Sequence, residues 1–135
     1  MSLGLYLHIP YCFSKCRYCD FYSAPGQRGV PRAYVDALLR ELSRFAPDAP
    51  LRPDTLYFGG GTPSLLDPAD AARLIAAAQP LPGAEITLEA NPETVTEDSL
   101  RAFREAGVNR ISFGVQSARD SQLKTLGRPH TARQA

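Results

Sequence analysis

The chain has 135 residues, with 15 basic and 14 acidic side chains and a formal net charge of +1. This length suits one compact domain, and 44% hydrophobic with 21% charged residues is ordinary for a globular protein, which argues against a disordered, collagen-like or disulfide-knot chain. Because the basic residues are scattered and no apolar run reaches the roughly 18 residues of a membrane span, neither nucleic acid nor a membrane is an expected partner.

Four short apolar runs predict β-strands, at residues 3–9, 54–58, 84–90 and 109–116. A helical pattern follows each run. The first predicted helix begins near Pro31 and has one apolar face, made of Tyr34, Leu38, Leu42 and Phe45. The proline-rich stretch at 46–53 predicts an exposed loop before the second strand.

Capping residues set the ends of the next predicted helices. Asp67 and Pro68 form a favourable N-cap and first-turn pair for a helix that ends before Pro80. Thr96 caps the third helix, and Gly107 provides the left-handed residue that stops it. These ends leave a turn or loop between each strand and the helix beside it.

A fourth, short helix is expected at 118–126, ending at Gly127. The resulting order βαβαβαβα predicts a parallel sheet with right-handed crossovers. In three strands apolar residues alternate with a second set that would share the other face, comprising Gly4, Tyr6, His8, Thr87, Glu89, Asn91, Ser112, Gly114 and Gln116.

A parallel strand that helices cover on both faces should be apolar on both, so these polar faces are unusual for a doubly wound sheet. They favour a barrel whose interior binds something polar. We therefore predict an α/β fold of parallel βα repeats that form an incomplete, open TIM-like barrel of about four βα units. A sheet with one solvated face is the alternative.

The cysteines Cys12, Cys16 and Cys19 all lie within YCFSKCRYCDFY, residues 11–22, with the spacing C-x3-C-x2-C. An odd, clustered set argues against a secreted disulfide framework, and without a recognisable leader at the N-terminus we expect a cytoplasmic protein. Structural zinc nearly always has four protein ligands, and His8 could close such a site only by reaching back from the first strand. A 4Fe–4S cluster with three cysteine ligands has one iron left for a substrate.

The cysteine spacing after a first strand resembles the signature of the radical S-adenosylmethionine superfamily. The stretches YLHIPYCFSKCRYCDF, LYFGGGTPSLL, EITLEANPETV and GVNRISFGVQS further resemble the oxygen-independent coproporphyrinogen III oxidase family, which includes HemN oxidases and HemW haem chaperones. The resemblance runs from Leu5 to about Arg128. It implies that residues 1–135 are the N-terminal part of a radical S-adenosylmethionine core domain, with no second domain.

The resemblance also implies the cofactors and their ligands. The three cysteines would ligate a 4Fe–4S cluster, and S-adenosylmethionine would chelate the open iron. Eight residues match contacts to S-adenosylmethionine in the family: Tyr6, Tyr18, Gly60, Gly61, Thr62, Glu89, Gln116 and Arg128. No residue is assigned as catalytic.

Several of these residues have simpler explanations when they are taken alone. The glycines at 59–61 suit a flexible strand-to-helix turn and lack the motif of a phosphate loop. Glu89 could form a salt bridge with Arg110, since a buried carboxylate needs a partner. Arg128 could be a solvated loop charge.

Phe21 separates two branches of the family. In HemN oxidases the cysteine motif resembles C-x3-C-x2-C-x-C, and Phe21 stands where their extra cysteine would be. This departure favours the HemW haem-chaperone branch, with haem as a further ligand. The alternative is an oxygen-independent coproporphyrinogen III oxidase of porphyrin biosynthesis, which would act on a porphyrinogen. Either function implies an electron donor such as a flavodoxin or ferredoxin. A third expectation is that 135 residues alone form an inactive fragment, because an open barrel has an unpaired strand edge.

Overall fold

The computed structural model describes residues 2–135. Within this range four strands alternate with four α-helices: β1 (Gly4–Ile9), α1 (Arg32–Phe45), β2 (Thr55–Gly60), α2 (Pro68–Ala78), β3 (Glu85–Ala90), α3 (Glu97–Ala106), β4 (Arg110–Phe113) and α4 (Asp120–Leu126). Two short 3-10 turns follow β2 and β3, η1 (Pro63–Leu65) and η2 (Pro92–Thr94). All neighbouring strands are parallel, in the order β1-β2-β3-β4. The predicted βα order and parallel sheet are confirmed.

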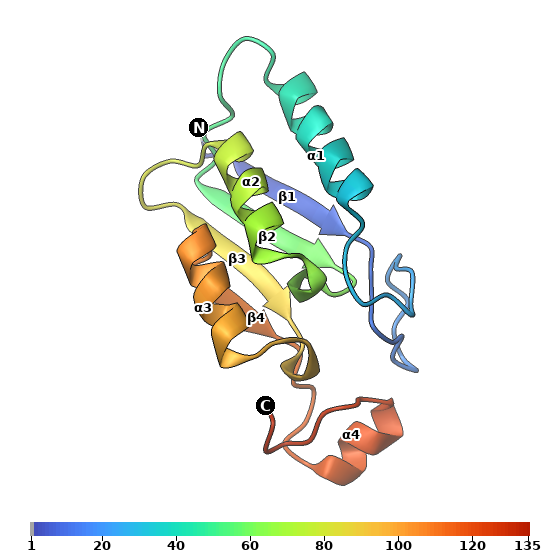
Figure 1. Cartoon of the computed structure of the whole chain (residues 1–135). Helices are drawn as coiled ribbons and strands as arrows, with labels where there is room; N and C mark the ends of the chain where they lie inside the picture. Colours follow the sequence, from blue (N-terminus) through green and yellow to red (C-terminus); the bar gives the residue numbers. More distant parts are fainter. Residues whose placement is uncertain (1) are drawn as a thin grey trace.

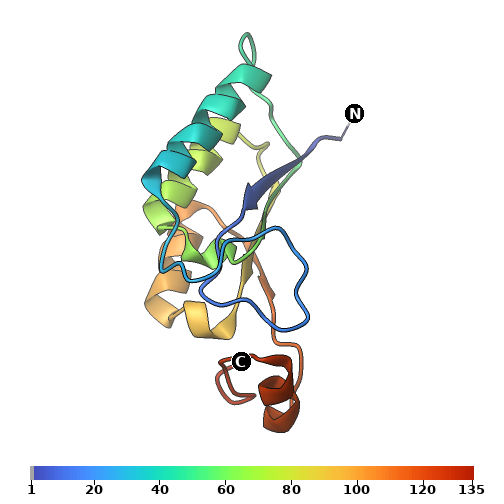
Figure 2. The same ribbon diagram turned by 90° about the vertical axis from the view of Figure 1, so that its right-hand side faces the viewer.

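In the described part of the chain, helices cover one face of this sheet and leave the other bare. Figure 1 shows α1, α2 and α3 side by side in front of the strands, and the edge-on view in Figure 2 shows all three on the same side. The loop after β1 and helix α4 lie beyond the carboxyl ends of the strands. The sheet is therefore open, as predicted, and its uncovered face is available to line a site.

The hydrophobic core lies between the sheet and these three helices. It includes Leu7, Ile9, Leu56, Phe58, Leu88, Val35, Leu74 and Phe103, each at most 4% exposed. Side chains alternate along a strand, so the residues between these core positions face the open side. Tyr6, Tyr57 and Glu89 occupy such positions, and the alternation read from the sequence thus sets which residues face the site.

The helix ends follow the predicted chemistry. The Asp67 side chain accepts a hydrogen bond from the Ala69 backbone N–H at 2.8 Å, and Thr96 accepts one from Ser99 at 3.2 Å. Gly107 and Gly127 have φ angles of 114° and 75°, in the left-handed region that glycine adopts without strain.

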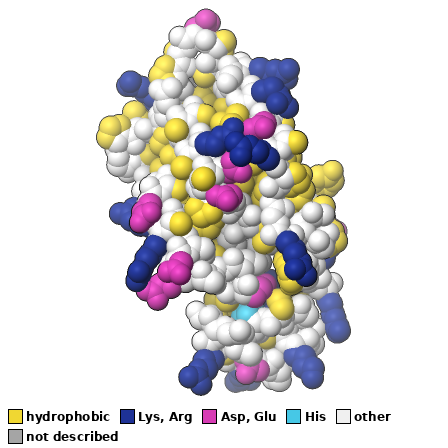
Figure 3. All heavy atoms as spheres, in the orientation of Figure 1, with side chains coloured by type: hydrophobic (Ala, Val, Ile, Leu, Met, Phe, Trp, Pro, Cys, Tyr) yellow, Lys and Arg dark blue, Asp and Glu magenta, His cyan; other side chains and the backbone are white. Residues whose placement is uncertain are grey.

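Charged side chains of both signs are interspersed over the helix-covered face (Figure 3). Arg73 of α2 pairs with Asp36 of α1 at 2.9 Å and with Asp70 of its own helix at 2.8 Å. These groups are solvated and their attraction is screened, so the pairs contribute little to stability. The apolar core therefore accounts for most of the attraction between α1 and α2.

Two local predictions are wrong. Phe45 is the last residue of α1 and is 76% exposed, whereas Val35 and Leu42 supply the buried positions of this helix. The fourth strand, predicted over 109–116, ends at Phe113, because the backbone turns at Val115 and Gln116 has a φ of 69°. No helix among residues 2–135 is long and apolar enough to cross a membrane.

Candidate functional site

The cysteine loop connects β1 to α1 at the carboxyl end of the sheet. Cys12 is buried, whereas Cys16 and Cys19 are partly exposed, and all three thiols are free. Backbone hydrogen bonds fold the loop back on itself, from Cys12 N–H to Ala24 O at 2.9 Å and from Gln27 N–H to Cys12 O at 2.9 Å. The loop is thus held at Cys12, and the other two thiols lie nearer to solvent.

A cavity of about 290 Å³ opens beside this loop. Its lining includes Cys12, Cys16, Tyr18, Cys19, Gly60, Gly61, Thr62, Glu89, Gln116 and Arg128. These residues come from the loops and strand ends of all four βα units, where parallel α/β proteins bind ligands. Of the residues predicted to contact S-adenosylmethionine, seven lie here and Tyr6 does not.

The glycine segment at the end of β2 passes directly under the cysteine loop. A Cβ atom built on Gly61 would lie 2.6 Å from Tyr11 O and 2.8 Å from Cys12 Sγ. Gly60 has a φ of 124°, a conformation that side-chain-bearing residues rarely adopt. A flexible turn does not require such close approach, so these glycines serve the packing of the pocket wall as well.

Glu89 is held in place by two hydrogen bonds. Its carboxylate accepts from the Tyr57 hydroxyl at 2.7 Å and from the Gly60 N–H at 3.1 Å. Arg110, the partner suggested by the sequence, instead donates to Thr87 at 3.2 Å and to Glu85 at 3.4 Å. Burial, followed by the hydrogen bond to Glu89, raises the pKa of Tyr57, so the phenol remains a donor to the carboxylate.

Arg128 is buried, with 5% of its side chain exposed, so it is not a solvated loop charge. Its guanidinium donates to Cys16 Sγ at 3.1 Å, to Asn91 Oδ1 at 2.7 Å and to Gly114 O at 2.6 Å. Burial disfavours the charged form, but the hydrogen bond to Cys16 and the negative charges around it raise the pKa of Arg128 overall. Its Nε–H is buried without a partner among the described residues.

Tyr6, Tyr18 and Gln116 differ in their positions. Tyr6 lies on the open face of the sheet, 55% exposed, and stacks on Tyr57 with ring centroids 5.9 Å apart. Tyr18 lines the cavity; burial, followed by the charge of Cys16, raises its pKa. Gln116 lines the cavity from the turn after β4.

Sequence reasoning did not assign a role to Asn91, which joins two parts of the pocket. Its amide donates to Thr62 Oγ1 at 3.3 Å, while Thr62 donates to Cys12 Sγ at 3.5 Å and Arg128 reaches Cys16. Asn91 follows a predicted strand and lies on its polar face, and this was the available signal. One polar network therefore reaches the sulfurs of two cysteines.

The three thiols line one cavity without converging on a single point. Within residues 2–135 no three cysteine, histidine or carboxylate side chains converge closely enough to hold one metal ion. In an iron–sulfur cluster, by contrast, each thiolate binds a different iron, so such convergence is not needed. Three free thiols around one cavity, with a buried arginine near them, fit that group.

Comparison with known proteins identifies the family. A family model described as "Radical SAM superfamily" matches residues 6–135. The chain belongs to the radical SAM superfamily. An Escherichia coli relative named "Heme chaperone HemW" is 48% identical over 98% of this chain and 37% of its own length. A Bos taurus relative, "Radical S-adenosyl methionine domain-containing protein 1, mitochondrial", is 42% identical over 98% of this chain and 31% of its own.

A solved structure shares the fold of this radical SAM protein. It is titled "Coproporphyrinogen III oxidase (HemN) from Escherichia coli is a Radical SAM enzyme" and matches with a TM-score of 0.83 at 30% identity, covering 98% of this chain and 32% of the other. The predicted resemblance to the HemN and HemW family and the partial barrel are confirmed. The chain spans about a third of the length of these relatives.

Proposed function

We propose that this protein binds a 4Fe–4S cluster through Cys12, Cys16 and Cys19, with S-adenosylmethionine beside it. One observation carries the proposal: three free thiols and the glycine-rich segment line the same cavity at the carboxyl end of a parallel sheet. Membership of the radical SAM superfamily supports it. When bound, the cluster would supply the electron that cleaves S-adenosylmethionine.

The residues of this chain would hold and orient that ligand. Gly60 and Gly61 leave their backbone open to close approach because they have no side chains. Glu89 is fixed by hydrogen bonds from Tyr57 and Gly60, and its remaining lone pairs can accept a hydrogen bond from a ribose hydroxyl. Arg128 offers a buried N–H to an anionic group. Further proposed contacts are Tyr6, Tyr18, Thr62 and Gln116.

Anaerobic reconstitution of the full-length protein with iron and sulfide tests the cluster. We expect close to four irons per chain and an EPR signal after reduction, both strongly reduced when any of the three cysteines is changed to alanine. Ser23→Ala is the matched control, because Ser23 lies on the same loop but not in the cavity. A single tetrahedral zinc, or cysteine variants with full iron content, would contradict the proposal.

We further propose that the full-length protein acts as a haem chaperone of HemW type. The relative named "Heme chaperone HemW" at 48% identity supports this, as does Phe21 at the position of the extra HemN cysteine. Phe21 lines the cavity and is 70% exposed, so an apolar ring stands where that cysteine would be. Haem titration should show saturable, stoichiometric binding, and a protein that takes up the cluster but no haem would exclude this function.

A second candidate is a coproporphyrinogen III oxidase, favoured by the structural match to HemN. It would remove carbon dioxide from a porphyrinogen, with electrons from a donor such as a flavodoxin or ferredoxin. The full-length protein incubated with substrate, reductant and S-adenosylmethionine should then release carbon dioxide. No release under conditions that cleave S-adenosylmethionine would rule this candidate out.

Residues 1–135 are proposed to form one domain, the N-terminal part of a radical SAM core. On its own this domain is expected to self-associate and to have no activity. Edge strand β4 has Phe113 at its end, 42% exposed, and within residues 2–135 no helix covers the opposite face of the sheet. Size-exclusion chromatography of the 135-residue chain should show oligomers or aggregates. A monodisperse monomer with a cooperative melt would contradict this expectation.

A further inference from the structure

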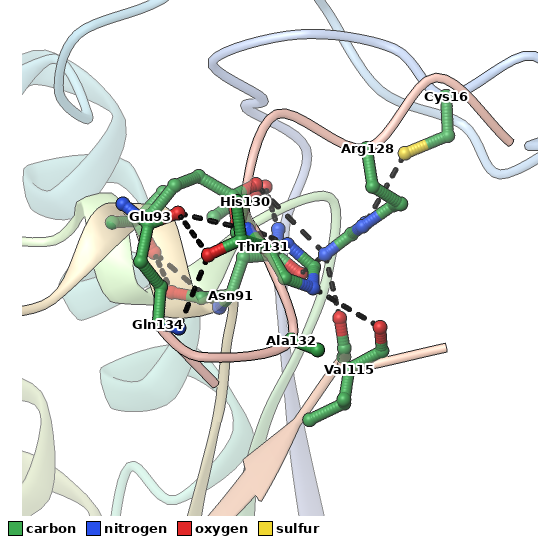
Figure 4. A network of polar contacts seen from close by, with 12 residues as sticks. Cys16, Asn91, Glu93, Val115, Arg128, His130, Thr131, Ala132 and Gln134 are labelled. Carbon is green, nitrogen blue, oxygen red and sulfur yellow. Dashed lines mark hydrogen bonds and ion pairs between the residues drawn. The ribbon is translucent and has the colours of Figure 1, made fainter. Parts of the chain in front are cut away.

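A buried polar network lies behind the cavity, in the segment that follows α4 (Figure 4). Its central residue is His130, whose side chain is fully buried. Glu93, in the turn after β3, is its neighbour and has 16% of its side chain exposed. Neither residue lines the cavity, and neither was singled out from the sequence.

Both ring nitrogens of His130 are used within the protein. Nε2 lies 3.0 Å from the carbonyl oxygen of Val115, and a carbonyl only accepts, so this nitrogen carries a hydrogen. Nδ1 lies 3.0 Å from Glu93 Oε2, within hydrogen-bond distance. His130 therefore ties the turn after β4 to the turn after β3.

Glu93 connects His130 to Arg128. Its second oxygen, Oε1, lies 3.8 Å from the Arg128 guanidinium, so one carboxylate faces both the imidazole and the arginine. A buried guanidinium needs a counter-charge, because an unpaired buried charge is costly. Glu93 supplies it from the side of the network away from Cys16, as the close-up shows (Figure 4).

The turn that His130 holds also contacts Arg128. Val115 is preceded by Gly114, whose carbonyl accepts from Arg128 at 2.6 Å, and followed by Gln116, which lines the cavity. A Cβ on Gly114 would lie 2.6 Å from Asn91 Oδ1, so this turn is packed against the asparagine that also accepts from Arg128. A shift of the turn would therefore move two hydrogen-bond acceptors of the guanidinium.

We propose that His130, together with Glu93, is a positioning pair that fixes Arg128 against the cysteine loop and thereby sets the affinity of the cavity for S-adenosylmethionine. This inference rests on the proposed function of the cavity. With the pair intact, the guanidinium stays directed at Cys16 and its unpartnered Nε–H stays in place. Without the pair, Arg128 can rotate towards other acceptors. Its N–H must then be ordered during ligand binding, and the entropy cost of this ordering weakens the affinity.

Two conservative variants test the pair in the full-length, reconstituted protein. His130→Gln keeps one donor but cannot span from Glu93 to Val115, and Glu93→Gln removes the counter-charge while it keeps the shape. Equilibrium dialysis should show S-adenosylmethionine bound about tenfold more weakly in each, the lower end of the range for residues that orient ligating groups. Glu97→Gln, an exposed carboxylate on α3 with a partner arginine, is the matched control and should bind as the wild type does.

A double-mutant cycle separates positioning from general damage. If His130 acts through Arg128, then His130→Gln should weaken binding no further in an Arg128→Met background. Additive losses, or wild-type affinity in both single variants, would overturn the proposal. If His130→Gln does not fold, as circular dichroism would show, Glu93→Gln decides the question.

A readout that needs no cluster keeps this inference separate from the proposed function. In cluster-free protein labelled with 15N-arginine, the buried Nε–H of Arg128 should exchange slowly with solvent and give a sharp signal, which broadens and exchanges faster in Glu93→Gln. An unchanged signal would refute the positioning pair. Failure of the wild type to take up iron would refute the proposed function alone.

Discussion

Changing Gly61 to alanine tests how closely the pocket wall is packed under the cysteine loop. The added methyl would lie 2.6 Å from Tyr11 O, 2.8 Å from Cys12 Sγ and 3.0 Å from the Tyr11 carbonyl carbon. These atoms belong to backbone or to a buried thiol, so they must move by several tenths of an ångström, and the hydrogen bonds Gly61 N–H to Ile9 O and Thr62 N–H to Tyr11 O must stretch with them.

Overpacking of this kind typically costs about 1–3 kcal/mol. With an m-value of about 2 kcal/mol/M, a loss near 2 kcal/mol lowers the urea midpoint by about 1 M. The same movement displaces Cys12, so we expect Gly61→Ala to hold clearly less iron after reconstitution. The assays are urea unfolding of the cluster-free, full-length protein and iron counting of the reconstituted one.

Gly29 offers the matched control for this substitution. A Cβ there would meet only Leu65 O, at 3.9 Å, and the backbone is not in the left-handed region. Gly29→Ala should leave iron content unchanged and alter stability by no more than about 1 kcal/mol, in the stabilising direction if at all. If Gly61→Ala matched this control in both assays, the close approach of the glycine segment to Cys12 would have no consequence, and the reasoning would fail.

Three more predictions concern the core and the carboxylate of the site. Phe58→Ala empties a fully buried position and should lower the free energy of unfolding by about 3–5 kcal/mol, measured by urea unfolding. Glu89→Gln removes the charge that accepts two hydrogen bonds and should weaken S-adenosylmethionine binding at least about tenfold, measured by equilibrium dialysis. Burial and then the hydrogen bond to Glu89 raise the pKa of Tyr57, so the folded state holds this proton more tightly than the unfolded chain. The free energy of unfolding should therefore fall as the pH rises above about 10. Tyr57→Phe should lose less stability than the wild type over the same pH range.

The local features of the fold were readable from the sequence because they depend on near neighbours in the chain. Strand alternation indicated which faces carry the core, and Asp67, Thr96, Gly107 and Gly127 cap their helices as predicted. The burial of Phe45 was predicted wrongly because it depends on how the last turn of α1 lies relative to the sheet, and helical spacing alone does not contain that information. The length of β4 was overestimated for a similar reason, since the turn after it is held by Arg128 and His130, which are distant in the sequence.

For the site, the spacing of the three cysteines was enough to predict an under-ligated cluster, because ligand number and spacing are properties of a short segment, and the cluster stays a prediction. Other relations exist only in three dimensions. Arg128 meets Cys16 across 112 positions of the chain, and Tyr57 meets Glu89 across 32, because the strand register and the return of the chain after α4 bring them together. The burial of His130 is of the same kind: nothing beside it in the sequence predicts it, since its partners lie in the turns after β3 and β4. Sequence determined the residue chemistry and the local elements. Tertiary packing decided which polar groups form hydrogen bonds or ion pairs with one another, since that depends on distances between segments that are far apart in the chain.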